Sequence, residues 1–587
     1  MQRPNWKLRR FAHYDRASLP VKSMDMKDRY PSGTTIPASR LVETDLQPDY
    51  SPYSIPRPDQ SWNVGYRLAD LHVAEGRGDL FAAIHAETER HYTFTDLARE
   101  STRLAAGLVD LGVRPGDRIA YRTTNDPDAI VLMLAVWKAG GVLVPVPAQA
   151  KSTDIRHFIV DTGARLLFVH GHAGPLDDAK TAVAESSITE IIGFGAGHEG
   201  CNLRSWNELK RDQKTALPAV DPDQVAIIWH TGGTTGVPKG CYHTHRRFLI
   251  GGYAFGEGTG ASVGQRWMAA APIGHALGII HCTIFSMLHG ATVVFVEQYP
   301  DPKALLTAVA KHKVTTLTAL MASWAKMAEV ARADAGVDIS SLRRCFAMWQ
   351  SASSSEVFDF WLSRGVELLN NFGSTSFATW VLVPPLGVAS PRAALGRALP
   401  GYQVEAVELA NGKVSPVKQG FGRMAVRGPT GLTYWNLPEL QKRDVVDGWT
   451  LSDDLIEFDD EGNAHYLGRT DYMISTAGYK VAPVEVEQVL SRHAAVREVC
   501  VVPAPCPTRH EIVVAYVVLL DGYVGDNAIR NELLTIVKSE LASYKAPRRI
   551  EFIDALPRDA VGKVQTKIVK QWASATPGET SGAGEGA

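Results

Sequence analysis

Thr231-Gly232-Gly233-Thr234-Thr235-Gly236-Val237-Pro238-Lys239-Gly240 (TGGTTGVPKG) is the stretch that decides the fold of this chain. It follows the apolar run Val225–Trp229 (VAIIW), which predicts a buried strand. Its glycines let backbone N–H groups approach phosphate oxygens, and three threonine hydroxyls and the Lys239 ammonium add further contacts. It is not a Walker A loop, because Pro238 precedes the lysine and Gly240 follows it. The pattern therefore predicts a phosphate-binding loop at the end of a strand.

Short strands alternate with helical stretches from Trp62 onward. Arg118–Arg122 and Val142–Val146 predict strands on either side of a helix at Ala129–Lys138. This alternation predicts an α/β fold, with a large N-terminal domain of layered, mostly parallel sheets and helices.

Two more strands are predicted to end in polar loops. Arg344–Trp349 runs into a Ser-rich turn and then a helix from about Ser355, and Val366–Phe372 runs into Gly373-Ser374-Thr375. Ligands of open α/β sheets bind outside the carboxyl ends of the strands. We therefore expect these loops and the phosphate-binding loop to share one site.

The sequence pattern changes after Gly468. Later segments predict a small mobile α+β domain, with helices at Pro483–His493 and Asn527–Leu541 and strands at Val496–Val502, Glu511–Leu519 and Arg549–Ile553. The expected division is an N-terminal extension (1–60), a large ATP- and acyl-binding domain (61–470), a small C-terminal lid domain (471–573) and a disordered, Gly-rich tail (574–587).

Composition narrows the class of protein. Hydrophobic residues make up 45%, charged residues 21%, and the formal net charge is -2, which gives no electrostatic footprint for nucleic acid or an anionic membrane. The N-terminus lacks the apolar stretch of a signal peptide, and the six cysteines form no CxxC pair. These features predict a cytoplasmic protein with reduced, buried thiols and small-molecule substrates, and with neither a nucleic-acid nor a membrane partner.

The ten-residue loop resembles the signature loop of the superfamily of acyl-CoA synthetases, adenylation domains and luciferases, with Gly232 at the variable second place of the pattern. Further segments match in the same order over residues 62–570. The resemblance implies that the protein uses ATP and Mg²⁺ to activate a carboxylic acid as an acyl-adenylate. It also implies that coenzyme A then accepts the acyl group.

The resemblance extends to a nucleotide segment, Asn371-Phe372-Gly373-Ser374-Thr375. It implies that Phe372 stacks on adenine, that Asn371 bonds to its amino group, and that Thr375 touches the α-phosphate. Ser376 stands where the family has a magnesium-binding Glu, so the metal ligand stays unassigned.

A ribose segment and a hinge segment are also similar to those of the family. In WTLSDD (449–454), Asp454 aligns with the ribose-binding carboxylate, and the adjacent Asp453 is the competing choice. In the following GRTD segment, the resemblance implies that Arg469 reaches the ribose or the phosphate. Asp471 would be the hinge residue whose backbone rotates.

Residues of the C-terminal part complete the implied machinery. PRDAVGK (557–563) resembles the segment of the catalytic lysine, which assigns that role to Lys563. Gly478-Tyr479-Lys480 would face coenzyme A after the small domain has rotated.

The acyl side is implied by Pro272-Ile273-Gly274-His275, which resembles a segment bordering the acyl pocket. His275 is a candidate gate and catalytic residue, and a packed core histidine is the alternative. The proposed pocket residues are His275, Ala276, Gly278, Trp349 and Ser351, of which Ser351 is also a candidate nucleotide contact. Small residues leave room for a flat ring, and Trp349 offers an aromatic wall or is simply core.

The opening segment Trp62–Leu80 resembles that of benzoate-type and aminobenzoate-type CoA ligases, which favours an aromatic or cyclic acid. Alternative acceptors are a carrier protein, an amine or, as in luciferases, oxygen. A further alternative is a catalytically inactive nucleotide-binding homologue, against which the presence of Lys563, Asp454 and Arg469 argues. A homodimer is left open.

Overall fold

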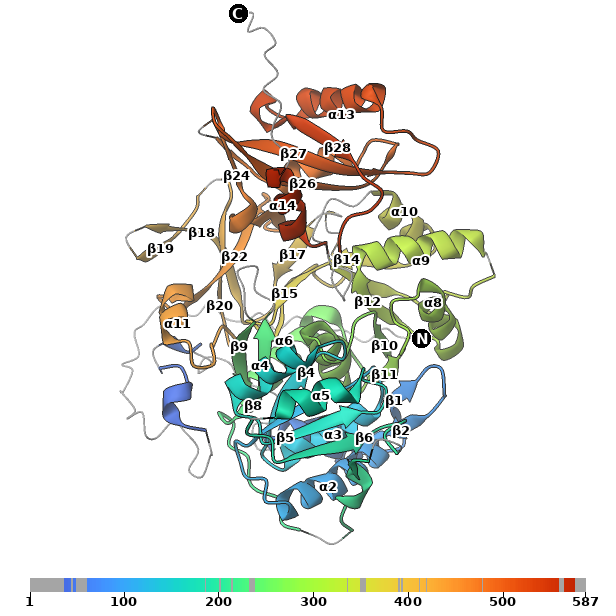
Figure 1. Cartoon of the computed structure of the whole chain (residues 1–587). Coiled ribbons are helices and arrows are strands. Elements are labelled where there is room, and N and C mark those ends of the chain that lie inside the picture. Colours follow the sequence, from blue (N-terminus) through green and yellow to red (C-terminus); the bar gives the residue numbers. More distant parts are fainter. Residues whose placement is uncertain are drawn as a thin grey trace, which may run out of the picture.

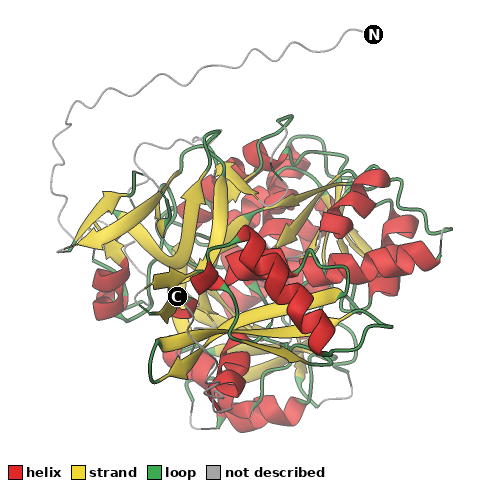
Figure 2. Cartoon of the chain, turned by 90° about the horizontal axis from the view of Figure 1, so that it is seen from above, coloured by secondary structure: helices red, strands yellow, loops and turns green. Residues whose placement is uncertain are grey.

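The computed structural model describes residues 36–43, 46–48, 61–184, 186–199, 202–212, 215–231, 238–334, 336–348, 355–388, 391, 394–410, 412–418, 420–477, 479–558 and 564–575. Within these ranges the strands form four sheets, of seven, seven, nine and five strands. In Figure 1 the five-stranded sheet lies at the top, above a larger body that contains the other three. Helices flank the sheets over much of the molecule (Figure 2).

The first seven-stranded sheet has the order β7-β6-β5-β3-β4-β8-β9. Its strands are β3 (Arg118–Arg122), β4 (Val142–Val146), β5 (Leu166–His170), β6 (Glu190–Phe194), β7 (Arg204–Ser205), β8 (Val225–Thr231) and β9 (Lys239–Thr244). All neighbours are parallel except β8 and β9, which pair antiparallel on either side of the predicted phosphate-binding loop. β3, β4 and β8 begin where the sequence predicts strands.

The second seven-stranded sheet has the order β14-β13-β12-β10-β11-β1-β2 and is parallel apart from the β1–β2 hairpin. Its strands are β1 (Phe81–His85), β2 (His91–Thr93), β10 (Arg266–Ala269), β11 (Thr292–Phe295), β12 (Thr316–Leu320), β13 (Arg344–Met348) and β14 (Glu367–Asn370). The prediction of layered, mostly parallel sheets with helices is thus confirmed for both seven-stranded sheets.

The helices of the body are α1 (Leu71–Ala74), α2 (Phe94–Asp110), α3 (Asp128–Lys138), α4 (Ser152–Thr162), α5 (Leu176–Val183), α6 (His245–Thr259), α7 (Ser286–Leu288), α8 (Pro302–His312), α9 (Met321–Ala333), α10 (Ser355–Ser363) and α11 (Pro438–Asp444). Every residue of α3 is buried, because its sequence DAIVLMLAVWK is apolar on all sides. None of the helices in the described ranges combines the length and the apolar character that a membrane span needs.

The nine-stranded sheet was not foreseen. It contains β15 (Phe372–Ser374), β16 (Thr379–Val383), β17 (Ala394–Ala398), β18 (Gln403–Ala410), β19 (Lys413–Pro416), β20 (Gly422–Arg427), β21 (Val445–Val446), β22 (Trp449–Phe458) and β23 (Ala464–Arg469), and all its pairs are antiparallel. The single strand predicted over Val366–Phe372 is wrong. β14 ends at Asn370 and the chain enters this other sheet at Phe372, so Gly373 and Ser374 lie in a strand rather than a loop.

The five-stranded sheet has a hydrophobic core of its own, which includes Val501, Val513 and Leu533. Its elements are β24 (Ile474–Thr476), β25 (Tyr479–Val481), α12 (Pro483–Leu490), β26 (Val496–Cys506), β27 (His510–Leu519), α13 (Asn527–Glu540), β28 (Arg549–Phe552) and α14 (Thr566–Ala575). The predicted helices and strands of the small domain are all present, with bounds that differ by a few residues. A small α+β domain after residue 470 is therefore what the fold shows, whereas its exact limits stay a prediction.

The cysteines follow the prediction in part. Cys241, Cys345 and Cys500 are buried free thiols, but Cys506 is partly exposed because it lies at the end of β26, next to a turn. The side chains of the other two cysteines lie outside the described residues.

A buried carboxyl group, that of Glu487 on α12, joins the helix to the sheet of the small domain. Its Oε1 accepts a hydrogen bond of 2.8 Å from the Val501 N–H, and burial raises its pKa from 4.5 to about 8. Tyr466 and Cys500 are the titratable groups that interact with it. The folded protein thus holds a proton on Glu487 at pH values where the unfolded chain has released it.

Glu487→Gln should therefore flatten the pH dependence of stability. Between pH 4.5 and 8 the folded state binds more protons than the unfolded state, so the free energy of unfolding of the wild type falls as pH rises. Glutamine keeps the acceptor and does not titrate. The quantity to compare is the Tm of the variant minus the Tm of the wild type. We expect this difference to be at least about 3 °C larger at pH 8 than at pH 5. Thermal unfolding followed by circular dichroism measures this, and parallel pH curves for the two proteins would contradict it.

Candidate active site

Asn371 lies where the chain passes from β14 to β15, and it is only 3% exposed. Its carboxamide nitrogen and oxygen both have no hydrogen-bond partner among the described residues. Leaving a buried polar group unpaired costs about 1–3 kcal/mol. A ligand edge that offers both an acceptor and a donor, as adenine does, would remove this cost. The unpaired carboxamide of Asn371 is thus compatible with the adenine contact that the family resemblance implies.

Gly373 is required by the close approach of β15 and β16. A Cβ at this position would lie 2.6 Å from Cδ1 of Trp380 and 2.7 Å from the carbonyl oxygen of Thr379. The neighbouring Phe372 packs against the main core but remains partly exposed. The accessible part of the Phe372 ring, next to the unpaired Asn371, is suited to stacking against a planar base.

The turn after β15 is anchored by His243, a residue that the sequence reasoning missed. The His243 Nε2–H donates to the carbonyl oxygen of Thr375 at 2.8 Å. Burial, together with the nearby Arg247, lowers the pKa of His243 to about 3, so the ring is neutral. Because His243 lies in β9, this bond joins the Thr375 turn to the strand that follows the phosphate-binding loop. The position of the histidine in that strand was the one available signal.

The same turn contains a strained residue. Ala378 has φ 50°, in the left-handed region that residues with a Cβ seldom adopt. Such outliers gather at functional sites, where surrounding contacts hold them. Thr375 and Ser376, both partly exposed, precede it in this turn.

The phosphate-binding loop is described only at its two ends. Gly232, Gly233, Thr234, Thr235 and Gly236 lie outside the described residues, as does the side chain of Thr231. Lys239 is partly buried at the start of β9 and pairs with Thr231 across the hairpin.

Helix α4 holds both ends of this loop. Nε2–H of His157 donates to the carbonyl oxygen of Pro238 at 2.8 Å, and Nε2–H of His230 donates to the Asp161 carboxylate at 2.9 Å. Burial lowers the pKa of His230, although Asp161 opposes the shift. These two bonds fix the strand ends from which the loop leaves and to which it returns.

Asp454 and Arg469 face each other across β22 and β23. The Asp454 side chain is 12% exposed, with Arg469 Nη1 3.9 Å from its Oδ1. The Tyr466 hydroxyl donates to Oδ1 at 3.2 Å and the Ser452 hydroxyl donates to Oδ2. Burial and the Asp454 charge raise the pKa of Tyr466 well above its usual value, so the phenol keeps its proton. Because a carboxylate has about four lone-pair sites, Asp454 can still accept from ribose hydroxyls.

The competing Asp453 has a different environment. Its side chain is 40% exposed and forms ion pairs with Arg423 at 3.0 Å and Arg469 at 3.2 Å. Asp453 is therefore an exposed carboxylate in ion pairs with two partly buried arginines, whereas Asp454 is a buried acceptor oriented by two hydroxyl groups.

The predicted hinge lies between two sheets. Asp471 is in a short 3₁₀ helix, Thr470–Tyr472, which connects β23 of the nine-stranded sheet to β24 of the five-stranded sheet. The side chain of Asp471 lies outside the described residues. Gly468, just before this helix, has φ 114°, which favours glycine.

On the acyl side, His275 is exposed, so it is not the packed core histidine of the alternative. Its N–H donates to the carbonyl oxygen of Pro272 at 2.9 Å. Ala276 is partly buried, and a Cβ on Gly278 would lie 2.3 Å from the Pro272 oxygen. A π-helix, Leu277–Phe285, continues from this turn, and π-helical turns are frequent at functional sites.

Several predicted residues cannot be placed. Trp349, Ser351, Lys563, Gly478 and the side chain of Lys480 lie outside the described residues. Tyr479 is 55% exposed and stacks on Tyr544, with ring centroids 4.3 Å apart.

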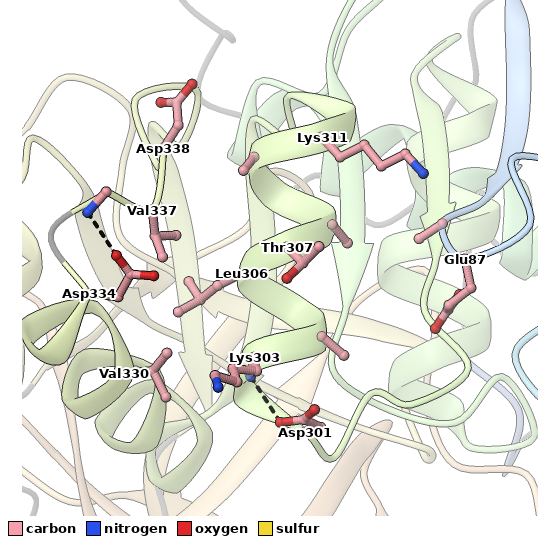
Figure 3. A pocket seen from close by; sticks show the side chains of 15 residues that line it. Glu87, Asp301, Lys303, Leu306, Thr307, Lys311, Val330, Asp334, Val337 and Asp338 are labelled. Atoms are coloured by element: carbon pink, nitrogen blue, oxygen red, sulfur yellow. Dashed lines mark hydrogen bonds between the residues drawn. The ribbon is translucent and has the colours of Figure 1, made fainter.

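A separate surface depression of about 1060 Å³ lies along α8, towards the loop after α9. Figure 3 shows Lys303, Thr307 and Lys311 of α8 facing it, with Asp334 and Asp338 on its rim. None of its lining residues belongs to the segments discussed above. The described residues also contain no group of three His, Cys, Asp or Glu side chains that could hold a metal ion.

Comparison with known proteins identifies the family. The model of the AMP-binding enzyme family matches residues 71–435, more than half of the chain, and the model of its C-terminal domain matches residues 485–563. This chain belongs to the AMP-binding enzyme family. It is 31% identical over 487 residues to the feruloyl-CoA synthase of Amycolatopsis sp, covering 82% of this chain and 94% of the relative. It is 28% identical over 519 residues to the benzoate–CoA ligase of Thauera aromatica, covering 88% and 97%.

The fold of this AMP-binding enzyme is shared with solved relatives. A crystal structure of an anthranilate CoA ligase in complex with anthranoyl-AMP superposes with a TM-score of 0.80 at 23% identity, covering 89% of this chain and 99% of that chain. The predicted superfamily and fold are therefore confirmed.

The two adjacent aspartates should differ in their effect on nucleotide binding. Asp454→Asn removes the charge that would accept the ribose hydroxyls, and hydrogen bonds to charged groups are worth roughly 1.5–3 kcal/mol. We expect the Kd for ATP to rise at least about tenfold. Asp453→Asn is the matched control and should change Kd less than about threefold, because the Asp453 side chain is 40% exposed and its ion pairs are screened by solvent. Isothermal titration calorimetry measures both, and a larger loss for Asp453→Asn would reverse the assignment.

Proposed function

We propose that this protein is an ATP-dependent, AMP-forming carboxylate–CoA ligase for aromatic acids. The single observation that carries the nucleotide site is the buried Asn371, whose carboxamide has no partner among the described residues and lies beside Phe372. Asp454 and Arg469 supply an oriented carboxylate and a cation for the ribose and the phosphates.

The reaction has two steps. The substrate carboxylate attacks the α-phosphorus of ATP, a P–O bond forms, and pyrophosphate leaves with the electrons of the bond that breaks. The thiolate of coenzyme A then attacks the carbonyl carbon of the mixed anhydride, and AMP leaves. In the first step charge builds up on phosphate oxygens, where Lys239 and Lys563 would stabilise it.

Two steps need two arrangements around one acyl carbon. A rotation at Asp471 would present Lys563 for adenylation and the Gly478-Tyr479-Lys480 segment for thioester formation. The position of Asp471 supports this role, because the short helix that contains it is the chain segment that links β23 of the nine-stranded sheet to β24 of the five-stranded sheet.

The relatives support an aromatic substrate. The feruloyl-CoA synthase and the benzoate–CoA ligase both carry aromatic acids in their names, and both are matched over more than four-fifths of this chain. Ala276 is small and partly buried, which suits a flat ring on the acyl side, whereas the backbone of Pro272 already fills the space beside Gly278. Coenzyme A is favoured as acceptor over a carrier protein or an amine.

Magnesium is a separate matter. Ser376 offers a neutral hydroxyl where a carboxylate would be the stronger ligand for Mg²⁺. We expect Mg²⁺ to bind mainly through the phosphates of ATP. The cytoplasmic location and the homodimer stay predictions.

A panel of acids tests the proposal. Thioester formation with benzoate, 2-aminobenzoate, salicylate, ferulate, cyclohexane carboxylate and medium-chain fatty acids should give the highest kcat/KM for a ring acid. If straight-chain acids exceed every ring acid by more than about tenfold, or roughly 1.4 kcal/mol of transition-state binding, the aryl assignment is wrong. Release of pyrophosphate without any thioester would instead favour an amine or carrier-protein acceptor. The absence of pyrophosphate release with all acids would favour the inactive homologue.

A further inference from the structure

Asn125 joins the two seven-stranded sheets through a fully paired side chain. It lies between β3 of one sheet and α3, and it is 4% exposed. Its Nδ2 donates to the carbonyl oxygens of Ala271 at 3.0 Å and Val296 at 3.2 Å. Its Oδ1 accepts from the Ile273 N–H at 2.7 Å. All three partners follow strands of the other sheet, β10 and β11.

The segment that carries Asn125 is itself held firmly. Arg90, from the β1–β2 hairpin, forms ion pairs with Asp126, at 2.5 Å, and with Asp128. The Tyr92 hydroxyl donates to Asp128 at 2.5 Å, and His170 Nε2 lies 3.4 Å from Asp126. Both aspartates are buried. These contacts therefore fix the backbone segment from which the Asn125 side chain extends.

Its bonds act directly on the acyl side of the site. Ala271 and Ile273 flank Pro272, whose carbonyl oxygen accepts the His275 N–H at 2.9 Å. The same oxygen packs against Gly278 so closely that a side chain at that position would clash with it. The position of Pro272 thus sets where the turn with His275 and Ala276 lies and where the π-helix, which contains Gly278, begins. A shift of Pro272 would move this wall as a unit.

We propose that Asn125 is a positioning residue that sets the wall formed by residues 272–278 against the acyl group, and so tunes the choice of acid. The inference rests on the proposed function, because it assigns that wall to an aromatic carboxylate. Loss of the side chain would leave two carbonyl groups and one N–H unpaired in a buried place and would release the wall. Misplacement of a positioning element by about 1 Å can cost up to about 100-fold in rate.

Asn63 offers a matched control. It is likewise buried, its Nδ2 donates to the Trp137 carbonyl oxygen at 2.9 Å, and its Oδ1 accepts from the Gly65 N–H at 2.9 Å. It contacts the opposite end of α3, away from Pro272. Asn63→Ala should lower Tm about as much as Asn125→Ala without moving the acyl wall.

The test compares steady-state kinetics of the full-length wild type, Asn125→Ala and Asn63→Ala with ATP, coenzyme A and the acid panel. For Asn125→Ala we expect the KM for the best ring acid to rise at least about fivefold and the preference for ring over straight-chain acids to shrink, with the KM for ATP within about twofold. Asn63→Ala should leave both KM values within about twofold. If Asn125→Ala does not fold, Asn125→Ser carries the same test, since its hydroxyl can keep one of the three bonds.

Two results would overturn the inference alone: an active Asn125 variant with unchanged KM and preference for acids, or equal changes in the KM values for acid and ATP. A wild type that activates no acid would overturn the proposed function and this inference with it.

Discussion

The register between β22 and β23 is the constraint on which the candidate site depends. It places Asp454 opposite Arg469, with Tyr466 close enough to donate to the same carboxylate. Because side chains alternate between the faces of a sheet, a slip of one residue would turn Asp454 and its partners to opposite faces. A bulge between Leu455 and Ile456 interrupts the ladder within this pairing. β23 then leads directly into the short helix that contains Asp471, so Arg469 and the connection to the small domain share one strand.

The rest of the site is assembled by contacts between segments far apart in the sequence. His243 of β9 bonds to Thr375, 132 residues later in the chain. Asn125 bonds to Ala271 and Val296, 146 and 171 residues away. The first bond joins strand β9 to the turn after β15, and the others join the segment after β3 to the segments that follow β10 and β11. Neutral, buried hydrogen bonds of this kind fix geometry without adding charge where the phosphates would bind, which suits a site that must stabilise negative charge.

Local patterns in the sequence predicted the parts of the fold that depend on local structure. The apolar runs at 118–122, 142–146 and 225–229 are strands, and the α3 helix lies where its all-apolar pattern places it. The nine-stranded sheet could not be predicted, because antiparallel strands with bulges and mixed faces show no clear periodicity of hydrophobic residues. The end of β14 before Asn371 could not be predicted for another reason. An apolar run indicates that a strand is buried, but it does not show that the chain passes from one sheet to another within the run.

For the site, the segments with a family resemblance pointed to Asn371, Phe372, Asp454, Arg469 and Asp471. The residues that hold them in place, His243, Tyr466, His157 and Asn125, lie outside the segments that resemble the family, and their contacts form only when separate strands and loops pack together. The choice between Asp453 and Asp454 likewise needed burial, which only the packing of β22 against β23 reveals.

The central claim is that the acid attacks ATP to form an acyl-adenylate before coenzyme A takes part. Exchange of radiolabelled pyrophosphate into ATP measures this first step directly, because the reverse reaction rebuilds ATP from the adenylate. With an aromatic acid present and coenzyme A absent, label should enter ATP, and it should not do so without the acid. Lack of acid-dependent exchange, together with release of ADP and phosphate in place of AMP, would contradict the mechanism.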